Sequence, residues 1–385
     1  MQSLVTETLR GRKAAFALEK EYIELFESLP GANVFFSPEW VYSWLLSLGR
    51  KYEVCFITCW DEGRLVGVWP FFEHRIPLIG TSLLPVGAQA ADLFDPVARE
   101  DAMRPLVEAL CALCQGYSFA WMPLLSVQFA DQVLQPAIKN GTGRHFLRKR
   151  TERFLVELDK FKSFEDFMQM VFGPKTRQSL RRKARRLAEK GEVRFQSLEK
   201  PEDISPWITK AMQLEKVSWK GEEGVGIFKR ATHRAFYHLL MENLAARGRL
   251  RLSILTLNDE LAAYEIGILG TDNYCMHATA FDPALASFSP GRLLMLDVLE
   301  KCIGEKRRIY DFLQNEQEFK RQMSTHASSF WDWIVFPRSL RGALLLVLMR
   351  TLHNWSEWKR RRAKKMEEAK RKAAENTESP VIDPE

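Results

Sequence analysis

The sequence predicts a protein of the α/β (α+β) class: two tandem halves, each a mixed, largely antiparallel sheet flanked by helices, and a C-terminal helical tail. Its 385 residues are enough for two domains, and 46% hydrophobic with 27% charged residues is typical of a globular chain with large cores. Runs of β-branched and aromatic residues alternate with helical periodicity, and the second half repeats this arrangement at greater length. We expect domains at 1–155 and 156–337 and the tail at 338–385.

The first half begins with a predicted hairpin. YEVCFITCW (52–60) and LVGVWPFF (65–72) flank the turn DEGR, and their composition favours antiparallel strands. A third short strand is expected near 76–79. A helix over 100–115 and a strand over 117–125 follow.

The second half has clearer punctuation. A helix is expected at FEDFMQMV, and helix 201–219 has Asp203 or Ser205 as its predicted N-cap. The other expected elements are a basic helix (175–190), a strand (193–198), a glycine-rich loop (221–228), a helix (233–248), a three-stranded meander (250–281), a helix (289–305) and a strand (307–313).

Cysteine usage and hydropathy bear on the compartment. The six cysteines lie mostly in apolar runs, as buried reduced thiols do, and the single CxxC pair, Cys111 and Cys114, lacks the second ligand pair of a zinc site. No apolar run approaches the roughly 20 residues that span a bilayer, and the N-terminus does not read as a secretory signal. We therefore expect a cytoplasmic protein without a metal.

The segment KTRQSLRRKARRLAEK (175–190) has eight Lys or Arg and one acid, an excess equal to the formal charge of the whole chain, +7. Such a helix suits nucleic acid, a membrane surface or a phosphate-rich ligand. Alternatively, it is a solvated helix whose Leu180, Ala184 and Leu187 pack inward.

The start of helix 289–305 is a candidate anion site. Its first turn exposes backbone N–H groups, and Gly291 lets a phosphate approach the backbone closely. An ordinary capped helix, with Ser289 as N-cap and Pro290 in the first turn, is the alternative.

Several motifs in this half resemble one family. FDPALASFSPGRLLMLDVLEKC followed by YDFLQNEQEFKRQM resembles the closing half of the acetyltransferase domain in CelD-like proteins of exopolysaccharide and cellulose loci. These proteins are a branch of the GNAT N-acyltransferase superfamily related to the FemABX peptidoglycan aminoacyltransferases. Asn315 stands where a glycine is usual, and Phe319 replaces a tyrosine. The matching residues are Asp282, Pro283, Ser289, Pro290, Gly291, Asp311, Phe312, Leu313, Glu316 and Lys320.

The resemblance spans about residues 33–336 and implies two GNAT-like halves, the second binding acyl-CoA as donor. It implies a transferase that acylates an amine, with a small-molecule amino sugar or a lipid-linked sugar precursor as acceptor. A tRNA-dependent aminoacyltransferase of the FemABX kind and an inert GNAT-like binding protein remain open; nucleic acid is expected only in the former. The expected donor-binding residues are Ser289, Gly291, Arg292, Arg181, Arg182 and Arg185.

Acyl transfer to an amine needs a base, and four residues are candidates. His277 and Glu265 lie in otherwise apolar strands of the meander, where a polar group needs a partner or a purpose. Cys275, His277, Thr279 and Phe281 are expected on one face of their strand. Asp311 and Lys320 carry the family resemblance, and Lys320 is expected to pair with Glu316. Each of these residues also has a purely structural explanation as a satisfied polar group.

The tail combines the apolar run GALLLVLM with two tryptophans and a basic cluster. Eight apolar residues are too few to cross a bilayer, but the composition is that of a helix lying in an anionic interface, here the inner membrane surface. Alternatively, Leu344, Leu348 and Leu352 pack back onto the second domain.

Overall fold

One continuous mixed sheet runs through both halves of the chain in the computed structural model, which describes residues 4–377 apart from 140, 142, 219, 222, 223, 225 and 315. Within those residues, thirteen strands form the sheet in the order β1-β2-β3-β4-β6-β13-β7-β12-β11-β10-β9-β8, with β5 paired to β3. The strands are β1 (Val5–Arg10), β2 (Val54–Asp61), β3 (Arg64–Ile76), β4 (Gly80–Pro85), β5 (Val97–Ala98), β6 (Ala120–Ser126), β7 (Arg144–Glu157), β8 (Val193–Leu198), β9 (Leu250–Leu257), β10 (Glu260–Leu269), β11 (Asn273–Phe281), β12 (Ile309–Asp311) and β13 (His326–Phe336).

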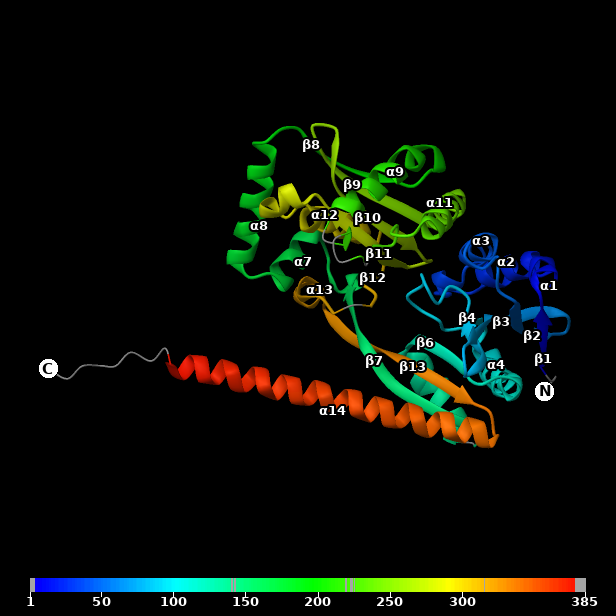
Figure 1. Cartoon of the computed structure of the whole chain (residues 1–385). Coiled ribbons are helices and arrows are strands. Elements are labelled where there is room, and N and C mark those ends of the chain that lie inside the picture. The colour runs from blue at the N-terminus through cyan, green and yellow to red at the C-terminus, as the bar shows by residue number, and fades with distance from the viewer. Residues whose placement is uncertain are drawn as a thin grey trace.

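Helices cover both halves, and the long α14 runs beside β7 and β13 and then away from the two lobes (Figure 1). The fold is the mixed α/β fold with a C-terminal helix that the sequence predicts. The helices are α1 (Arg12–Ala17), α2 (Glu19–Ser28), α3 (Pro38–Leu46), α4 (Glu100–Leu113), α5 (Val127–Phe129), α6 (Gln135–Lys139), α7 (Phe164–Val171), α8 (Pro174–Ala188), α9 (Pro201–Val217), α11 (Ala231–Ala246), α12 (Pro290–Gly304), α13 (Glu318–Met323) and α14 (Leu340–Thr377).

Turn residues confirm two predicted hairpins. Between β2 and β3, Glu62 and Gly63 have φ values of 49° and 79°, and between β9 and β10, Asn258 and Asp259 have 52° and 64°. Positive φ at both central residues is the type I′ geometry that matches the twist of antiparallel strands. Local sequence therefore specifies these hairpins.

Other element bounds differ from the sequence predictions. The expected strand at 76–79 is instead the turn between β3 and β4, where Leu78 has a φ of 65°. α9 begins at Pro201 after the N-cap Lys200, so neither Asp203 nor Ser205 is the cap, and Pro206 lies inside the helix. Residues 222, 223 and 225 of the expected glycine-rich loop lie outside the described residues.

The two halves share strands and a core. β7 crosses the expected boundary at 155, and β13, from the end of the second half, pairs with both β6 and β7. One hydrophobic cluster contains Trp40 and Trp69 from the first half with Tyr237 and Ile266 from the second. The halves are therefore built on one sheet, and the division at 155 and 337 stays a prediction.

Two parallel neighbours in the second half pair only briefly. β11 and β12 pair over Asn273–Cys275 and Ile309–Asp311, after which β11 continues to Phe281 without that neighbour. The sheet opens at this point, where the backbone and side chains of β11 face a cleft.

The alternative that the tail leucines pack back onto the second domain is wrong. Leu344, Leu348 and Leu352 are exposed, whereas α14 packs through Leu345, Leu346 and Met349 against β6, β7 and β13. The helix is therefore rotated so that the opposite apolar row faces outward.

Candidate active site

A cleft of about 1240 Å³ lies where β11 and β12 separate. Its walls come from both halves: the segment after β4 and strand β6 on one side, and β11, the loop after β12 and the start of α12 on the other. A cavity of this size, formed between two halves of a chain, is typical of a ligand site. Five of the ten expected donor-binding and catalytic residues line the cleft. They are Ser289, Gly291 and Arg292 at the start of α12, together with His277 and Lys320.

A β-bulge aims His277 into this cleft. Ile266 pairs with Ala278 and Gly267 with Met276, so His277 is an extra residue without a partner on β10. A bulge reverses the alternation of side chains beyond it. Cys275 and Ala278 consequently belong to the core shared by both halves, whereas Phe281 packs with the other core around α12. The expectation that Cys275, His277, Thr279 and Phe281 share one face is therefore wrong.

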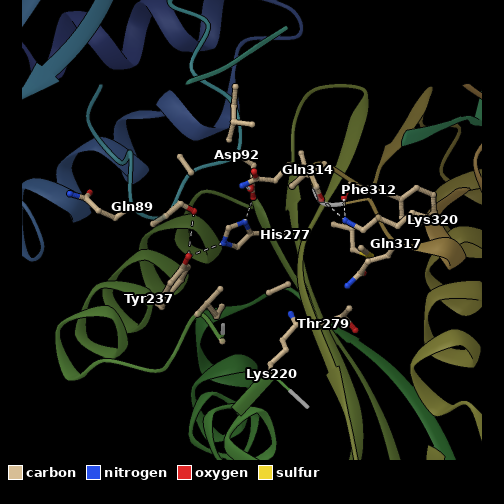
Figure 2. A pocket seen from close by; sticks show the side chains of 18 of the residues that line it. Gln89, Asp92, Lys220, Tyr237, His277, Thr279, Phe312, Gln314, Gln317 and Lys320 are labelled. Atoms are coloured by element: carbon tan, nitrogen blue, oxygen red, sulfur yellow. Dashed lines mark hydrogen bonds and ion pairs between the residues drawn. The ribbon is translucent and has the colours of Figure 1, made fainter. Parts of the chain in front are cut away.

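His277 is hydrogen-bonded on both ring nitrogens (Figure 2). Nδ1 lies 2.9 Å from Asp92 Oδ2, and Nε2 lies 3.0 Å from the Tyr237 hydroxyl. A carboxylate only accepts, so Nδ1 carries the proton and Nε2 is the acceptor for the phenol. This tautomer leaves the basic nitrogen toward Tyr237, with Asp92 placed to stabilise an imidazolium. Asp92 comes from the first half, so the pair exists only when both halves are assembled.

The loop after β12 holds Asp92 from the other side. Gln314 Nε2 donates to Asp92 Oδ1 at 2.6 Å. Lys320 Nζ donates to the carbonyls of Phe312 and Gln314, each at 2.6 Å, which fixes the path of this loop. The expected pair of Lys320 with Glu316 is wrong, because Glu316 instead binds Arg321.

Asp311 also stabilises the loop after β12. It is fully buried, forms an ion pair with Arg153 and accepts from the backbone N–H of Leu313 at 2.8 Å. Leu313 has a φ of 58°, a left-handed conformation that costs energy for a leucine and that this hydrogen bond stabilises. Asp311 does not line the cleft, so the structure places it as a support for the loop.

Two lysines make the cleft cationic. Burial lowers the pKa of Lys320 to about 8, and the neighbouring Lys220 acts in the same direction while Asp92 and Asp311 oppose it. Burial also lowers the pKa of Lys220. Both lysines line the same cleft as His277 and Thr279. Positive charge at this position suits an anionic ligand or a developing oxyanion.

Glu265 lies outside the cleft. It is fully buried, and Oε1 accepts from the hydroxyls of Tyr274 and Tyr310, both at 2.8 Å. Oε2 has no hydrogen-bond partner among the described residues. Burial raises the pKa of Glu265 from 4.5 to about 7, with the two tyrosines partly offsetting it. Because the Glu265 carboxyl is buried in the core, its protonation affects the free energy of unfolding.

Glu265→Gln should remove a pH dependence of stability. A pKa that is higher in the folded state means that the folded protein binds the proton more tightly, so this contribution is complete below pH 4.5 and is lost as pH rises to about 7. The free energy of unfolding should fall by about 3 kcal/mol more in the unmodified protein than in the variant over this range. Urea unfolding at pH 4.5–7.5 measures this difference, with Glu260→Gln, exposed on the same strand, as control. A parallel dependence in both proteins would contradict the prediction.

The start of α12 forms the other end of the cleft. Ser289 has a left-handed backbone (φ 56°, ψ 51°), so the chain turns sharply from the 3₁₀ helix Pro283–Phe288 into α12. Its side chain makes no cap bond to the helix, and its Oγ accepts from Lys183 Nζ at 2.7 Å instead. The alternative of an ordinary serine-capped helix is therefore wrong. Pro290 has no N–H, and the N–H groups of Arg292 and Leu293 donate to the Ser289 carbonyl, so the first turn offers the Gly291 N–H to a ligand.

Arg292 adds a cation in the same turn. It forms no ion pair with any acid in the described part of the chain, and its Nε has no partner there. Burial lowers its pKa, although a guanidinium keeps its charge at neutral pH. A half-buried arginine without an acidic partner, beside the Gly291 N–H at a helix N-terminus, is an arrangement suited to binding an anion.

The basic helix α8 divides its charges between two sides. Lys183 reaches Ser289, and Arg186 lies over the ring of Phe288 at 5.8 Å, both toward the start of α12. The expected ligand residues Arg181, Arg182 and Arg185 instead line a separate surface depression of about 430 Å³. Leu180 and Leu187 are buried, as expected of the inward face, whereas the expectation for Ala184 is wrong because it is exposed. The three arginines are thus not brought together with the cleft.

Sequence reasoning did not single out Asp92, Tyr237, Gln314 or Lys220. Asp92 lies in the segment ADLFDP, outside every predicted element, whereas Gln314 directly follows the matching residues Asp311, Phe312 and Leu313. Tyr237 had no signal beyond its helix, where an aromatic residue is typical of a core position.

The second half of the chain contains a domain of the GNAT class. Residues 174–321 match the model of the family described as "Acetyltransferase (GNAT) domain". This range includes His277, the start of α12 and Lys320. The chain is therefore an acyltransferase with a GNAT acetyltransferase domain, a class whose donor is an acyl-CoA.

Solved structures share this fold at low sequence identity. The crystal structure of FemX matches with a TM-score of 0.62 and 11% identity, covering 89% of this chain and 99% of that one. The C-terminal domain of a putative lysylphosphatidylglycerol synthetase from Agrobacterium fabrum matches with a TM-score of 0.56 and 12% identity, covering 88% and 96%. No curated protein sequence matches the chain.

In the described part of the chain, no cluster of three or more His, Cys, Asp or Glu could hold a metal ion. No helix there combines the length and the apolar character needed to cross a bilayer.

Proposed function

We propose that this protein transfers an acyl group from acyl-CoA to the amine of an amino sugar or of a lipid-linked sugar precursor, with His277 as general base. The observation that carries the proposal is the Asp92–His277–Tyr237 array in a cleft whose other end is the cationic start of α12. A base and an anion site in one cavity are the two features that an acyl-CoA-dependent acylation of an amine requires.

In this proposal, the donor's phosphates bind at the first turn of α12. The Gly291 N–H and the Arg292 guanidinium supply hydrogen bonds and positive charge there, and Lys183 extends the positive region from α8. Charge-assisted contacts of this kind are stronger than neutral ones. Arg181, Arg182 and Arg185 would then attract the donor only through long-range electrostatics.

The chemical step needs one proton taken and one returned. The acceptor amine attacks the thioester carbonyl, a C–N bond forms, and the C–S bond breaks. The amine's proton passes to His277 Nε2 through the Tyr237 hydroxyl, which lies 3.0 Å away. Burial raises the pKa of Tyr237 strongly, so the phenol relays a proton without ionising. The imidazolium, stabilised by Asp92, then protonates the departing thiolate.

The acceptor class rests on the resemblance to CelD-like proteins of polysaccharide loci. The part of the cleft away from the donor's phosphates has room for a sugar. A cytoplasmic location belongs to the same proposal and agrees with the burial of all six cysteines.

Calorimetry with acetyl-CoA and with aminoacyl-tRNA tests the donor. We expect saturable binding of acetyl-CoA, no specific binding of tRNA, and release of free thiol that requires an amino-sugar acceptor. Specific binding of tRNA without acetyl-CoA would replace the proposal with a FemABX-like aminoacyltransferase. Binding of neither donor would favour a GNAT-like protein without catalytic activity.

A further inference from the structure

The outward side of α14 carries a row of large apolar side chains. Leu344 is 75% exposed and Trp355 is 54% exposed. Residues three, four and seven positions apart share one face of a helix, so these side chains form one continuous strip. The members of this strip, called the outer row below, are Leu340, Leu344, Val347, Leu348, Leu352, Trp355 and Trp358.

The other side of the same helix fixes its orientation. Leu346 is buried, and Leu345 and Met349 pack beside it against Phe146 and Ile334 of the sheet. Arg148 on β7 contacts the ring of His353. Because this inner face is held, rotation of α14 cannot bury the outer row in the described part of the protein.

Basic residues accompany the outer row. Lys359 Nζ lies 3.6 Å from the ring centre of Trp355, and Arg362 lies 5.3 Å from that of Trp358. Between residues 338 and 377 the sequence has twelve Lys or Arg and four Glu. The helix therefore presents apolar and aromatic side chains together with a strong positive charge.

We propose that α14 lies in the interface of an anionic lipid bilayer and docks the protein on that surface. A large apolar face with tryptophans beside lysine and arginine is the composition of interfacial helices, whose apolar side enters the boundary between headgroups and acyl chains. At 1.5 Å per residue, the outer row from Leu340 to Trp358 is about 27 Å long. An apolar row of this length on one side of a helix lets the helix lie flat along a membrane surface.

The charge selects this occupant over a second copy of the chain. Two α14 helices packed row to row would bring two basic segments together, whereas anionic headgroups neutralise them. The turn before β4 extends the same surface: Leu78 is fully exposed, and Arg341 of α14 donates to the carbonyl of Ile79 beside it.

Co-sedimentation of the full chain with vesicles tests the proposal without reference to enzyme activity. The vesicles are phosphatidylcholine alone and phosphatidylcholine with about 30% phosphatidylglycerol. We expect binding to the anionic vesicles that weakens with salt, and little binding to the neutral ones. The triple variant Leu344→Glu, Leu348→Glu and Trp355→Glu should bind at least about tenfold more weakly. Its melting temperature should not change, because all three side chains are exposed.

Val5→Glu, Met170→Glu and Val217→Glu form a matched control, since these side chains are also exposed but lie on other elements. The control should keep full vesicle binding despite the same change in charge. Equal loss in both triple variants, undiminished binding of the α14 variant, or absence of binding by the unmodified chain would each overturn the proposal. A dimer in analytical ultracentrifugation that the α14 variant abolishes, without vesicle binding, would assign the row to a second copy instead.

Discussion

Replacing His277 with glutamine should lower kcat/KM for acyl transfer by about 10²- to 10⁴-fold. Glutamine can hydrogen-bond to Asp92 and Tyr237 but cannot hold a transferable proton, so the geometry survives and the base is lost. The pH profile of kcat/KM should report the general base in the unmodified enzyme and should lose that dependence in the variant. Steady-state thiol release measured across about pH 5 to 9 gives both quantities.

His238→Gln is the matched control. It lies one residue from Tyr237 on α11, where it pairs with Glu242 at the surface, and should leave the rate and pH profile unchanged. Asp92→Asn and Tyr237→Phe test positioning and relay: each should lower kcat and shift or flatten the pH profile while acetyl-CoA affinity stays constant. Full activity of folded His277→Gln would remove the general-base assignment and leave water or Lys320 as the proton acceptor.

Gly291→Val should weaken acetyl-CoA binding by about 100-fold or more. A Cβ at this position would lie 3.2 Å from Phe281 Cδ1, and a branched side chain would fill the approach to the first-turn N–H groups of α12. Arg292→Ala should weaken binding by about 10- to 100-fold, because one charge-assisted hydrogen bond contributes about 1.5–3 kcal/mol. Calorimetry with acetyl-CoA measures both effects.

Gly304→Val provides the comparison on the same helix. A Cβ at Gly304, at the far end of α12, would meet nothing within 4 Å. The same substitution there should leave affinity unchanged, which separates loss of the anion site from a general effect of valine on the helix. Unchanged affinity in folded Gly291→Val would refute donor binding at the start of α12.

The bulge at His277 illustrates a feature that sequence reasoning could not reach. Strict alternation along YCMHATAF puts His277 with Thr279 and Phe281, and one extra residue in the strand reverses that assignment. The register shift lies at Gly267, and a glycine inside a strand marks a bulge or a close approach without showing which residue of the neighbouring strand is the extra one. A sequence could therefore nominate His277 without showing which way it points.

Glu265 and the arginines of α8 show the opposite error. Both were chosen for chemical type, a carboxyl in an apolar strand and a dense cluster of cations. Burial among Tyr274 and Tyr310 removes Glu265 from the cleft, and helical rotation turns Arg181, Arg182 and Arg185 toward a separate depression. Chemical type predicts what a side chain can do, while packing decides what it can reach.

The sequence by itself determined the α/β class, the two hairpin turns and the amphipathic tail, because each depends on residues close together in the chain. Only the tertiary structure decided that Asp92 meets His277 and that the two halves share one sheet. Only it decided that Leu344, Leu348 and Leu352 face outward. These outcomes depend on contacts between segments far apart in sequence: Asp92 and His277 are 185 residues apart. The free energy of such contacts comes from the packing of the whole core, which no local pattern encodes.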